Sequence, residues 1–185
     1  MWKDAIAGED YTAHIIDCIK DCSVYEIPIL VLHPINGMTP LPAEDIGIER
    51  FKRIAGEAEK YNINLAIENQ GNPEYIDFVF KNVQSNKLYF CFDSGHENYY
   101  SPNLDLLDLY GDKLIALHLH DNDGTEDVHA LPFTGSVNWK KVDEKLNSLK
   151  YAGAIALETL NKGFENIKEP VEFLKIALER AKQIG

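Results

Sequence analysis

The sequence predicts an α/β protein in which helices cover a parallel sheet, and three observations support this prediction. Short β-type segments alternate with longer segments of helical periodicity five times along the chain. The β-type segments are almost continuously apolar, which is typical of parallel strands buried on both faces. No linker or low-complexity segment interrupts the alternation, so we expect residues 1–185 to form a single domain.

Five segments have the strand pattern, each four to six residues long and rich in aliphatic side chains. The predicted strands are Ile27–Leu32, Ile63–Ile67, Leu88–Phe92, Leu114–Leu119 and Ala154–Leu157.

Six segments between and around these strands have apolar residues at helical spacing. In the second of them, Ile46, Phe51 and Ile54 mark the apolar face. Pro73 suits the first turn of the third, and Gly111 suits the end of the fourth. The predicted helices are Tyr11–Tyr25, Ala43–Tyr61, Pro73–Val83, Leu104–Tyr110, Trp139–Leu149 and Glu169–Gln183.

Composition and charge narrow the classes of partner. The formal net charge of −12 argues against nucleic-acid binding, which needs clustered Lys and Arg. No apolar segment approaches the roughly 18 residues of a membrane span, and the first ten residues lack a signal-peptide core, so we expect a cytoplasmic protein without membrane contacts. The three cysteines fit that expectation as structural residues.

Each predicted strand ends in, or is followed at once by, an ionisable residue of metal-ligand type. These residues are His33, Glu68, Asp93, His118 and Glu158. In parallel α/β proteins the carboxyl ends of the strands face the same way, and active sites are built there. For a single strand such a residue could equally cap the next helix or solvate a loop, but five consecutive cases favour a shared site.

The acidic members of this set predict a metal ion. Converging carboxylates repel one another, and a divalent cation between them removes that repulsion. Glu68, Asp93, His118 and Glu158 provide three carboxylates and one imidazole, a set suited to Mn²⁺, Mg²⁺, Co²⁺ or Zn²⁺. No cysteine follows a strand, which argues against a cysteine-based structural zinc site.

Four segments also resemble the successive strand-end motifs of a known superfamily: LAIENQGN, FDSGHENYY, LHLHDNDGTEDVHALPFTG and IALET. They look like the motifs of the xylose-isomerase-like TIM barrels, which include sugar phosphate isomerases and epimerases, ketose 3-epimerases, inosose dehydratases and, more distantly, endonuclease IV-type nucleases. The resemblance runs from about Ile27 to Thr159. It implies a partial TIM (β/α) barrel of about five parallel strands and flanking helices that lacks the first three strands of the barrel at its N-terminal side. Open sheet edges favour association, so we expect a homo-oligomer.

The resemblance also implies roles for the strand-end residues. Carried over position by position, the metal ligands are Glu68, Asp93, His118 and Glu158. In the epimerase branch the two metal-bound glutamates, here Glu68 and Glu158, also transfer the proton next to the carbonyl.

Further positions are implied to face the substrate. His96 matches a histidine that contacts substrate or a second metal, His129 matches a position that binds substrate or phosphate, and His33 matches a strand-end histidine that is a metal ligand in the nuclease branch. Asn69 follows Glu68 and is suited to hydrogen-bonding a sugar hydroxyl, although capping the next turn explains it equally well. His120 occupies a position that is often Lys or Asn in the family, and we rank it last.

Together these observations predict a metal-dependent isomerase or epimerase acting on a sugar or sugar phosphate. Three alternatives remain open. They are an inosose-dehydratase-like lyase using the same residues, an endonuclease IV-like phosphodiesterase with further ligands at His33, His96, Asp127 and His129, and an inactive barrel fragment. The acidic net charge weighs against the phosphodiesterase.

Overall fold

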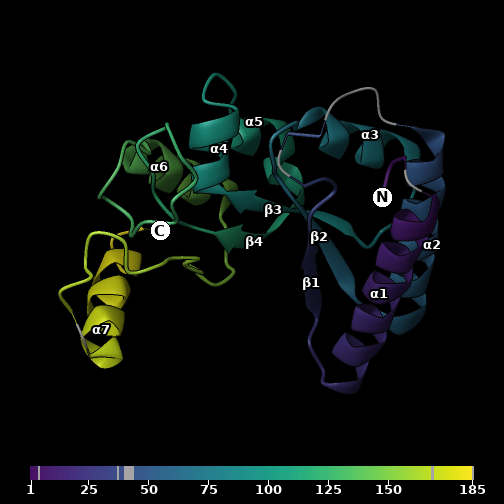
Figure 1. Ribbon diagram of the computed structural model, residues 1–185, viewed down its shortest axis with the longest axis horizontal. Coiled ribbons are helices and arrows are strands. Elements are labelled where there is room, and N and C mark those ends of the chain that lie inside the picture. Colours follow the sequence, from purple (N-terminus) through teal and green to yellow (C-terminus); the bar gives the residue numbers. More distant parts are fainter. Residues whose placement is uncertain (4, 37, 40–43, 168, 185) are drawn as a thin grey trace. The chain divides into compact units, whose positions relative to one another are not determined.

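The fold is a partial TIM barrel with a four-stranded parallel sheet in the order β1-β2-β3-β4. Figure 1 shows the computed structural model, which describes residues 1–185 except 4, 37, 40–43, 168 and 185. The strands are β1 (Ile29–Leu32), β2 (Asn64–Glu68), β3 (Leu88–Asp93) and β4 (Leu114–His118). Strands β1 and β2 pair in parallel from Ile29 opposite Asn64 to Leu32 opposite Ile67.

Seven α-helices and one short 3₁₀-helix accompany the sheet in the described part of the chain. They are α1 (Ala5–Val24), α2 (Asp45–Tyr61), α3 (Glu74–Asn82), α4 (Ser94–Tyr100), α5 (Leu106–Tyr110), η1 (Gly111–Lys113), α6 (Trp139–Leu149) and α7 (Pro170–Ala181). None of these helices combines the length and the apolarity needed to cross a bilayer.

The chain forms two compact units, Met1–Phe90 and Cys91–Gly185, and the boundary between them falls inside β3. In the first unit α1 and α2 lie side by side (Figure 1), and the Arg50 guanidinium, on a side chain only 1% exposed, joins them. It lies 3.0 Å from Glu9 Oε1 and donates to the carbonyl oxygens of Met1 and, at 3.2 Å, Ala5. The fully buried Phe51 and Ile54 of α2 form part of the core of this unit.

The second unit carries the end of β3, the whole of β4, and α4 to α7. The apolar face of α6 buries Trp139, Val142 and Leu146, which are spaced one and two turns apart. In contrast, α7 leaves Val171, Leu174 and Leu178 exposed.

The structure confirms most of the predicted elements and corrects three of them. Helix α1 begins at Ala5 rather than at Tyr11, α4 was not predicted, and the expected start of α2 at Ala43 lies outside the described residues. The predicted fifth strand is reduced to a bridge, in which Leu119 N donates to Ala156 O (2.9 Å) and Glu158 N donates to Leu119 O (3.1 Å).

Candidate metal centre

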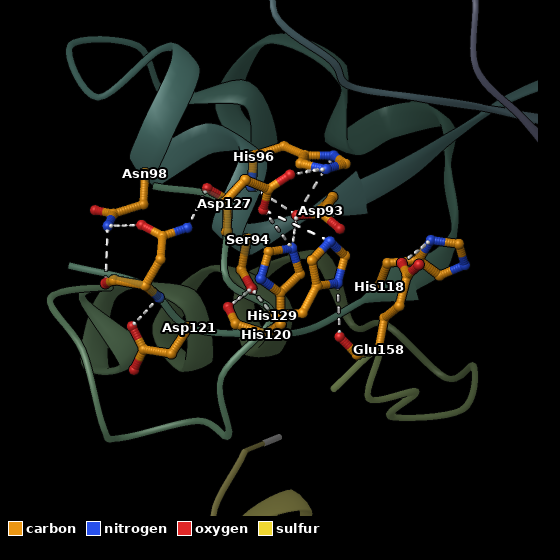
Figure 2. A network of polar contacts seen from close by, with 12 residues as sticks. Asp93, Ser94, His96, Asn98, His118, His120, Asp121, Asp127, His129 and Glu158 are labelled. Atoms are coloured by element: carbon orange, nitrogen blue, oxygen red, sulfur yellow. Dashed lines mark hydrogen bonds and ion pairs between the residues drawn. The ribbon is translucent and has the colours of Figure 1, made fainter. Parts of the chain in front are cut away.

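Two groups of donor side chains lie in the second unit, beyond the carboxyl ends of β3 and β4 (Figure 2). The first begins with Asp93, which is the last residue of β3 and fully buried. Its Oδ1 accepts a hydrogen bond from His96 N (2.7 Å) and thereby caps the start of α4. The strand end and the helix start therefore fix this carboxylate between them.

The rest of the first group comes from β4 and from the segment after the bridge. His118 Nδ1 lies 2.8 Å from Glu158 Oε2. Asp93, His118 and Glu158 each offer a donor atom within 4.8 Å of the others. Three of the four residues predicted to bind a metal are thus brought together within one unit.

The second group consists of His96, His120, Asp127 and His129, whose donor atoms also lie within 4.8 Å of one another. Asp127 lies at its centre. Its carboxylate oxygens are 3.1 Å from His96 Nε2, 3.7 Å from His120 Nε2 and 3.6 Å from His129 Nε2. The His120 and His129 rings stack face to face, with centroids 3.9 Å apart and planes 11° apart.

His120 is held at this point by the corner between β3 and α4. Ser94 Oγ donates to His120 O (2.8 Å) and accepts from His120 N (3.1 Å). The ring lies over Gly95, where an added Cβ would come within 1.9 Å of the imidazole. Glycine at position 95 is therefore what allows the fully buried His120 ring to approach Asp93, with Nε2 at 3.0 Å from Asp93 Oδ1.

The loop that carries Asp127 and His129 is organised by another buried carboxylate, Asp121. Its two oxygens accept hydrogen bonds from Asn122 N (2.9 Å), Val137 N (3.1 Å), Thr134 N (3.1 Å) and Trp139 Nε1 (2.8 Å). Asp121 also pairs through its backbone with Ala130. This pairing folds the loop back so that His129 lies over His120 (Figure 2).

The charges of the second group reinforce one another. Burial by itself would raise the pKa of Asp127, but the contacts with His129 and His96 outweigh it and hold that pKa well below its ordinary value. In turn, Asp127 raises the pKa of His129 to about 9, against the opposing effect of burial and with support from the carbonyl of Glu158. Without a cation, the group therefore holds a proton on His129 at neutral pH.

The first unit contains the remaining predicted residues. Glu68 ends β2 with only 1% of its side chain exposed, and its Oε1 lies 3.1 Å from His33 Nε2. The Gln70 amide nitrogen lies 3.1 Å from the same ring nitrogen, and Asn69 is fully buried between Glu68 and Gln70 in the chain. His33, Glu68 and Asn69 therefore cluster at the ends of β1 and β2.

The sequence analysis ranked His120 last and considered Asp127 only for the phosphodiesterase, whereas the structure brings both residues into the second group. A signal for His120 was present, because residues two apart in an extended chain point to the same side. Asp127 lies in a loop of irregular backbone, so no periodic pattern placed it.

The donor chemistry of both groups fits divalent cations. Imidazole and carboxylate are the ligands of Zn²⁺, Mn²⁺ and Co²⁺ sites. In the second group three buried atoms make no hydrogen bond among the described residues. They are the two ring nitrogens of His120 and Oδ1 of Asp127. Buried polar atoms without such partners are costly, and a cation bound between them would remove that cost.

Comparison with known proteins identifies the class of protein. The sequence profile described as xylose isomerase-like TIM barrel matches residues 3–177. The chain therefore belongs to the xylose isomerase-like TIM barrel family.

Two relatives show how much of a longer protein the chain matches. It is 30% identical over 186 residues to the uncharacterized protein MJ1311 of Methanocaldococcus jannaschii, covering 89% of this chain and 62% of that protein. It is 32% identical over 116 residues to the uncharacterized protein y4fM of Sinorhizobium fredii, covering 59% of this chain and 37% of that protein. The chain thus spans less than two thirds of the length of these relatives.

Solved structures show the same fold. A D-tagatose 3-epimerase-like protein is 26% identical, with a TM-score of 0.67 over 93% of this chain and 70% of that one. A D-psicose 3-epimerase from Clostridium cellulolyticum, solved with D-tagatose, has a TM-score of 0.77 at 16% identity, over 98% and 73% of the two chains. The IolI protein, solved with a zinc atom, has a TM-score of 0.78 at 15% identity, over 98% and 69%.

Proposed function

We propose that this protein is a metal-dependent isomerase or epimerase that moves a proton next to the carbonyl of a sugar or sugar phosphate. The observation that carries the proposal is the convergence of Asp93, His118 and Glu158, with donor atoms within 4.8 Å of one another. Membership of the xylose isomerase-like family and the fold shared with sugar epimerases support it.

Glu68 completes the proposed set of metal ligands. It is the ligand that the family resemblance implies at the end of β2, and its buried carboxylate is of the type that such an ion binds. The four residues then offer three carboxylates and one imidazole to Mn²⁺, Mg²⁺, Co²⁺ or Zn²⁺. A cation bound there would polarise the carbonyl oxygen of the sugar and stabilise negative charge developing on it.

The chain itself supplies the proton transfer. We assign the acid and base roles to Glu68 and Glu158, one carboxylate removing the proton from carbon and the other returning a proton to the opposite face. Glu68 is buried and Glu158 is about half exposed, at 47%, so the two carboxylates lie in different environments. Groups that act as acid and base in one reaction commonly differ in this way.

The sugar is proposed to contact polar side chains beside these carboxylates. His33 lies against Glu68, and Asn69 follows it in the chain. Hydroxyl groups of a sugar would hydrogen-bond to such side chains. His96 and His129 were predicted to contact the substrate, but their close approach to Asp127 also suits them to hold a second ion.

The decisive experiment follows deuterium from solvent into the sugar. The purified chain, loaded with Mn²⁺, is incubated in D₂O with a panel of ketoses and ketose phosphates, and products are identified by NMR. An epimerase or isomerase yields an isomeric sugar with deuterium on the carbon next to the carbonyl. A lyase of the inosose-dehydratase kind yields a dehydrated product instead. Absence of turnover with every substrate would favour an inactive fragment.

Replacing Glu158 by Gln tests the catalytic assignment. We expect Glu158→Gln to lower turnover by about 10²–10⁴-fold, because general acid–base catalysis contributes roughly that factor. Its far-UV circular dichroism should match the wild type. The matched control is Glu172→Gln, the same change at an exposed position of α7. Full activity in Glu158→Gln would refute the assignment.

One observation favours a second candidate, a phosphodiesterase of the nuclease branch. Donor atoms of His96, Asp127 and His129 lie within 4.8 Å of one another, as an enzyme of that branch would require to bind an additional ion. Cleavage of duplex DNA containing an abasic site, with binding that weakens steeply as salt rises, would support this candidate over the isomerase. Because the net charge is −12, we expect neither cleavage nor salt-dependent binding of this DNA.

A further inference from the structure

We propose that a small cavity beside α4 binds a primary alkylammonium ion. The cavity has a volume of about 120 Å³ and lies wholly within the second unit, between the start of α4, α5 and the first two turns of α6. Its described lining includes no member of the two donor groups at the strand ends. The inference therefore does not depend on the proposed function.

The body of the cavity is apolar. Phe92, Leu107 and Val142 line it, and each is at most 5% exposed, while Leu104 lines it and is 40% exposed. A cavity of about 150 Å³ lined by such side chains can hold a benzene molecule, so this one suits a ligand of roughly five non-hydrogen atoms. Burial of the carbon atoms of such a ligand favours binding.

Four charged side chains also line the cavity, and the two lysines among them are already paired. Asp105 Oδ2 lies 3.1 Å from Lys141 Nζ and 3.3 Å from Lys145 Nζ. Asp108, on the same side of α5, contacts Lys145 as well. Two aspartates thus balance the charges of two lysines.

The fourth charged side chain, Glu97, adds a carboxylate that these pairs do not neutralise. Its side chain is only 15% exposed. Its Oε2 accepts a hydrogen bond from Leu106 N (2.8 Å), whereas its Oε1 accepts none within the described residues and lies 4.0 Å from Lys141 Nζ. A shielded carboxylate oxygen of this kind is suited to a charged N–H donor.

The same charges disfavour other small ligands. An anion would meet the carboxylates of Glu97 and Asp105, and the lysines could bind it only by giving up their aspartates. A neutral alcohol would fit the apolar part of the cavity but would bring a weaker, uncharged donor to Glu97. The net charge of −12 also attracts cations to the chain as a whole.

A ligand in the cavity would contact residues that hold α4 in place. Ser94 and Asn98 both line the cavity. Ser94 Oγ bonds the backbone of His120, and the Asn98 amide nitrogen donates to Asn122 Oδ1 (2.8 Å) and Ser136 Oγ (3.0 Å). Binding would therefore stabilise the corner between β3 and α4.

The test titrates the whole chain, labelled with ¹⁵N, with n-butylamine, n-butanol or butyrate at neutral pH and constant ionic strength. These probes share an alkyl chain and differ in charge. We expect n-butylamine to cause saturable shifts of the backbone amide signals of Asn98, Leu107 and Ser136, n-butanol to bind more weakly, and butyrate not to bind. Glu97→Gln keeps an oxygen acceptor for Leu106 N, and it should weaken n-butylamine binding by about tenfold or more, because a charge-assisted hydrogen bond is lost.

Two further variants complete the test. Leu104→Trp places a larger side chain at a partly exposed position of the lining and should abolish binding, which covers the case in which Glu97→Gln does not fold. The matched control is Glu144→Gln, which changes an exposed carboxylate of α6 outside the cavity and should bind n-butylamine as the wild type does.

Three results would overturn the proposal: no saturable shift with any probe, binding of n-butanol or butyrate as tight as that of n-butylamine, or unchanged n-butylamine affinity in Glu97→Gln. Failure of the proposed isomerase activity would leave the titration unchanged.

Discussion

At the scale of single residues, the pair formed by Asp127 and His129 determines how the metal-free site behaves. The two side chains lie 3.6 Å apart and are mostly shielded from solvent. Their mutual stabilisation places a positive charge on His129 where a cation would otherwise lie. A proton and a metal ion therefore compete for the same ring nitrogen.

This competition predicts a pH-dependent stability of the metal-free protein. The pKa of His129 is raised to about 9 in the folded state, above the ordinary value of about 6.5. Its contribution to stability is therefore fully present below about pH 6.5 and is lost as the pH rises through about 9. With excess chelator, the difference in melting temperature between wild type and His129→Gln should be largest at pH 6 and should vanish by pH 10.

The control for this prediction is His14→Gln, which removes an exposed histidine of α1 in the other unit. It should not reproduce the pH-dependent difference. A difference for His129→Gln that stays constant from pH 6 to pH 10 would mean that the ring carries no extra proton in the folded protein.

At the scale of elements, the packing of α1 on α2 depends on one buried arginine. The Arg50 guanidinium reaches from α2 to the backbone at the start of α1, and Gly8 leaves room for it, since a Cβ there would lie 2.2 Å from the guanidinium. Arg53 of α2 contacts Glu9, as Arg50 does, but its side chain is 52% exposed. The two arginines therefore share a partner and differ in burial.

We expect Arg50→Ala to lower the free energy of unfolding by about 1–3 kcal/mol, because it removes a buried guanidinium together with its hydrogen bonds to the main-chain carbonyls of Met1 and Ala5. Arg53→Ala should change it far less, because solvent replaces an exposed pair. Urea unfolding of both variants measures the contrast. An equal loss of unfolding free energy in the two variants would show that the stabilisation comes from the charge of Glu9 and not from the buried contacts of Arg50.

The elements also show what the sequence could predict and what it could not. The bounds of α6 were predicted correctly because its apolar face repeats at helical spacing. The first six residues of α1 were missed because Gly8 and two acids weaken the local signal, whereas contacts with Arg50 stabilise the helix there. Helix α4 was missed because its start, Ser-Gly-His, has no apolar period and depends on the cap from Asp93.

The same reasoning applies to the site. The approach of Asp93 to His118 was predictable, because parallel strands end at one edge of a sheet. The second group was only partly predictable, because Asp127 and His129 reach it through a loop folded by Asp121. Contacts of this kind depend on tertiary structure and leave no local periodicity in the sequence.

At the scale of the whole molecule, helix α7 carries a row of exposed apolar side chains. Val171, Leu174 and Leu178 lie on one face of α7 and are 63%, 62% and 55% exposed. Contiguous exposed apolar residues are typical of interaction surfaces. We propose that a second copy of the chain covers them.

Sedimentation velocity tests this proposal directly. The wild type should sediment as an oligomer at micromolar concentration, and Leu174→Lys should shift it toward the monomer by placing a charge in the apolar stripe. Lys175→Ala, a neighbouring change outside the stripe, should leave the distribution unchanged. A wild type that is monomeric at every concentration would contradict the proposal.

The hydrogen bonds of Asp121 have a consequence for the affinity of the second group for an ion. Three backbone N–H groups of the loop and the indole N–H of Trp139 in α6 converge on this one carboxylate, so the folded chain holds the loop in place without a bound ion. The entropy of ordering the loop is then part of folding and not of binding. A cation would then meet preorganised ligands, and its affinity would reflect coordination, desolvation and the displacement of the proton from His129.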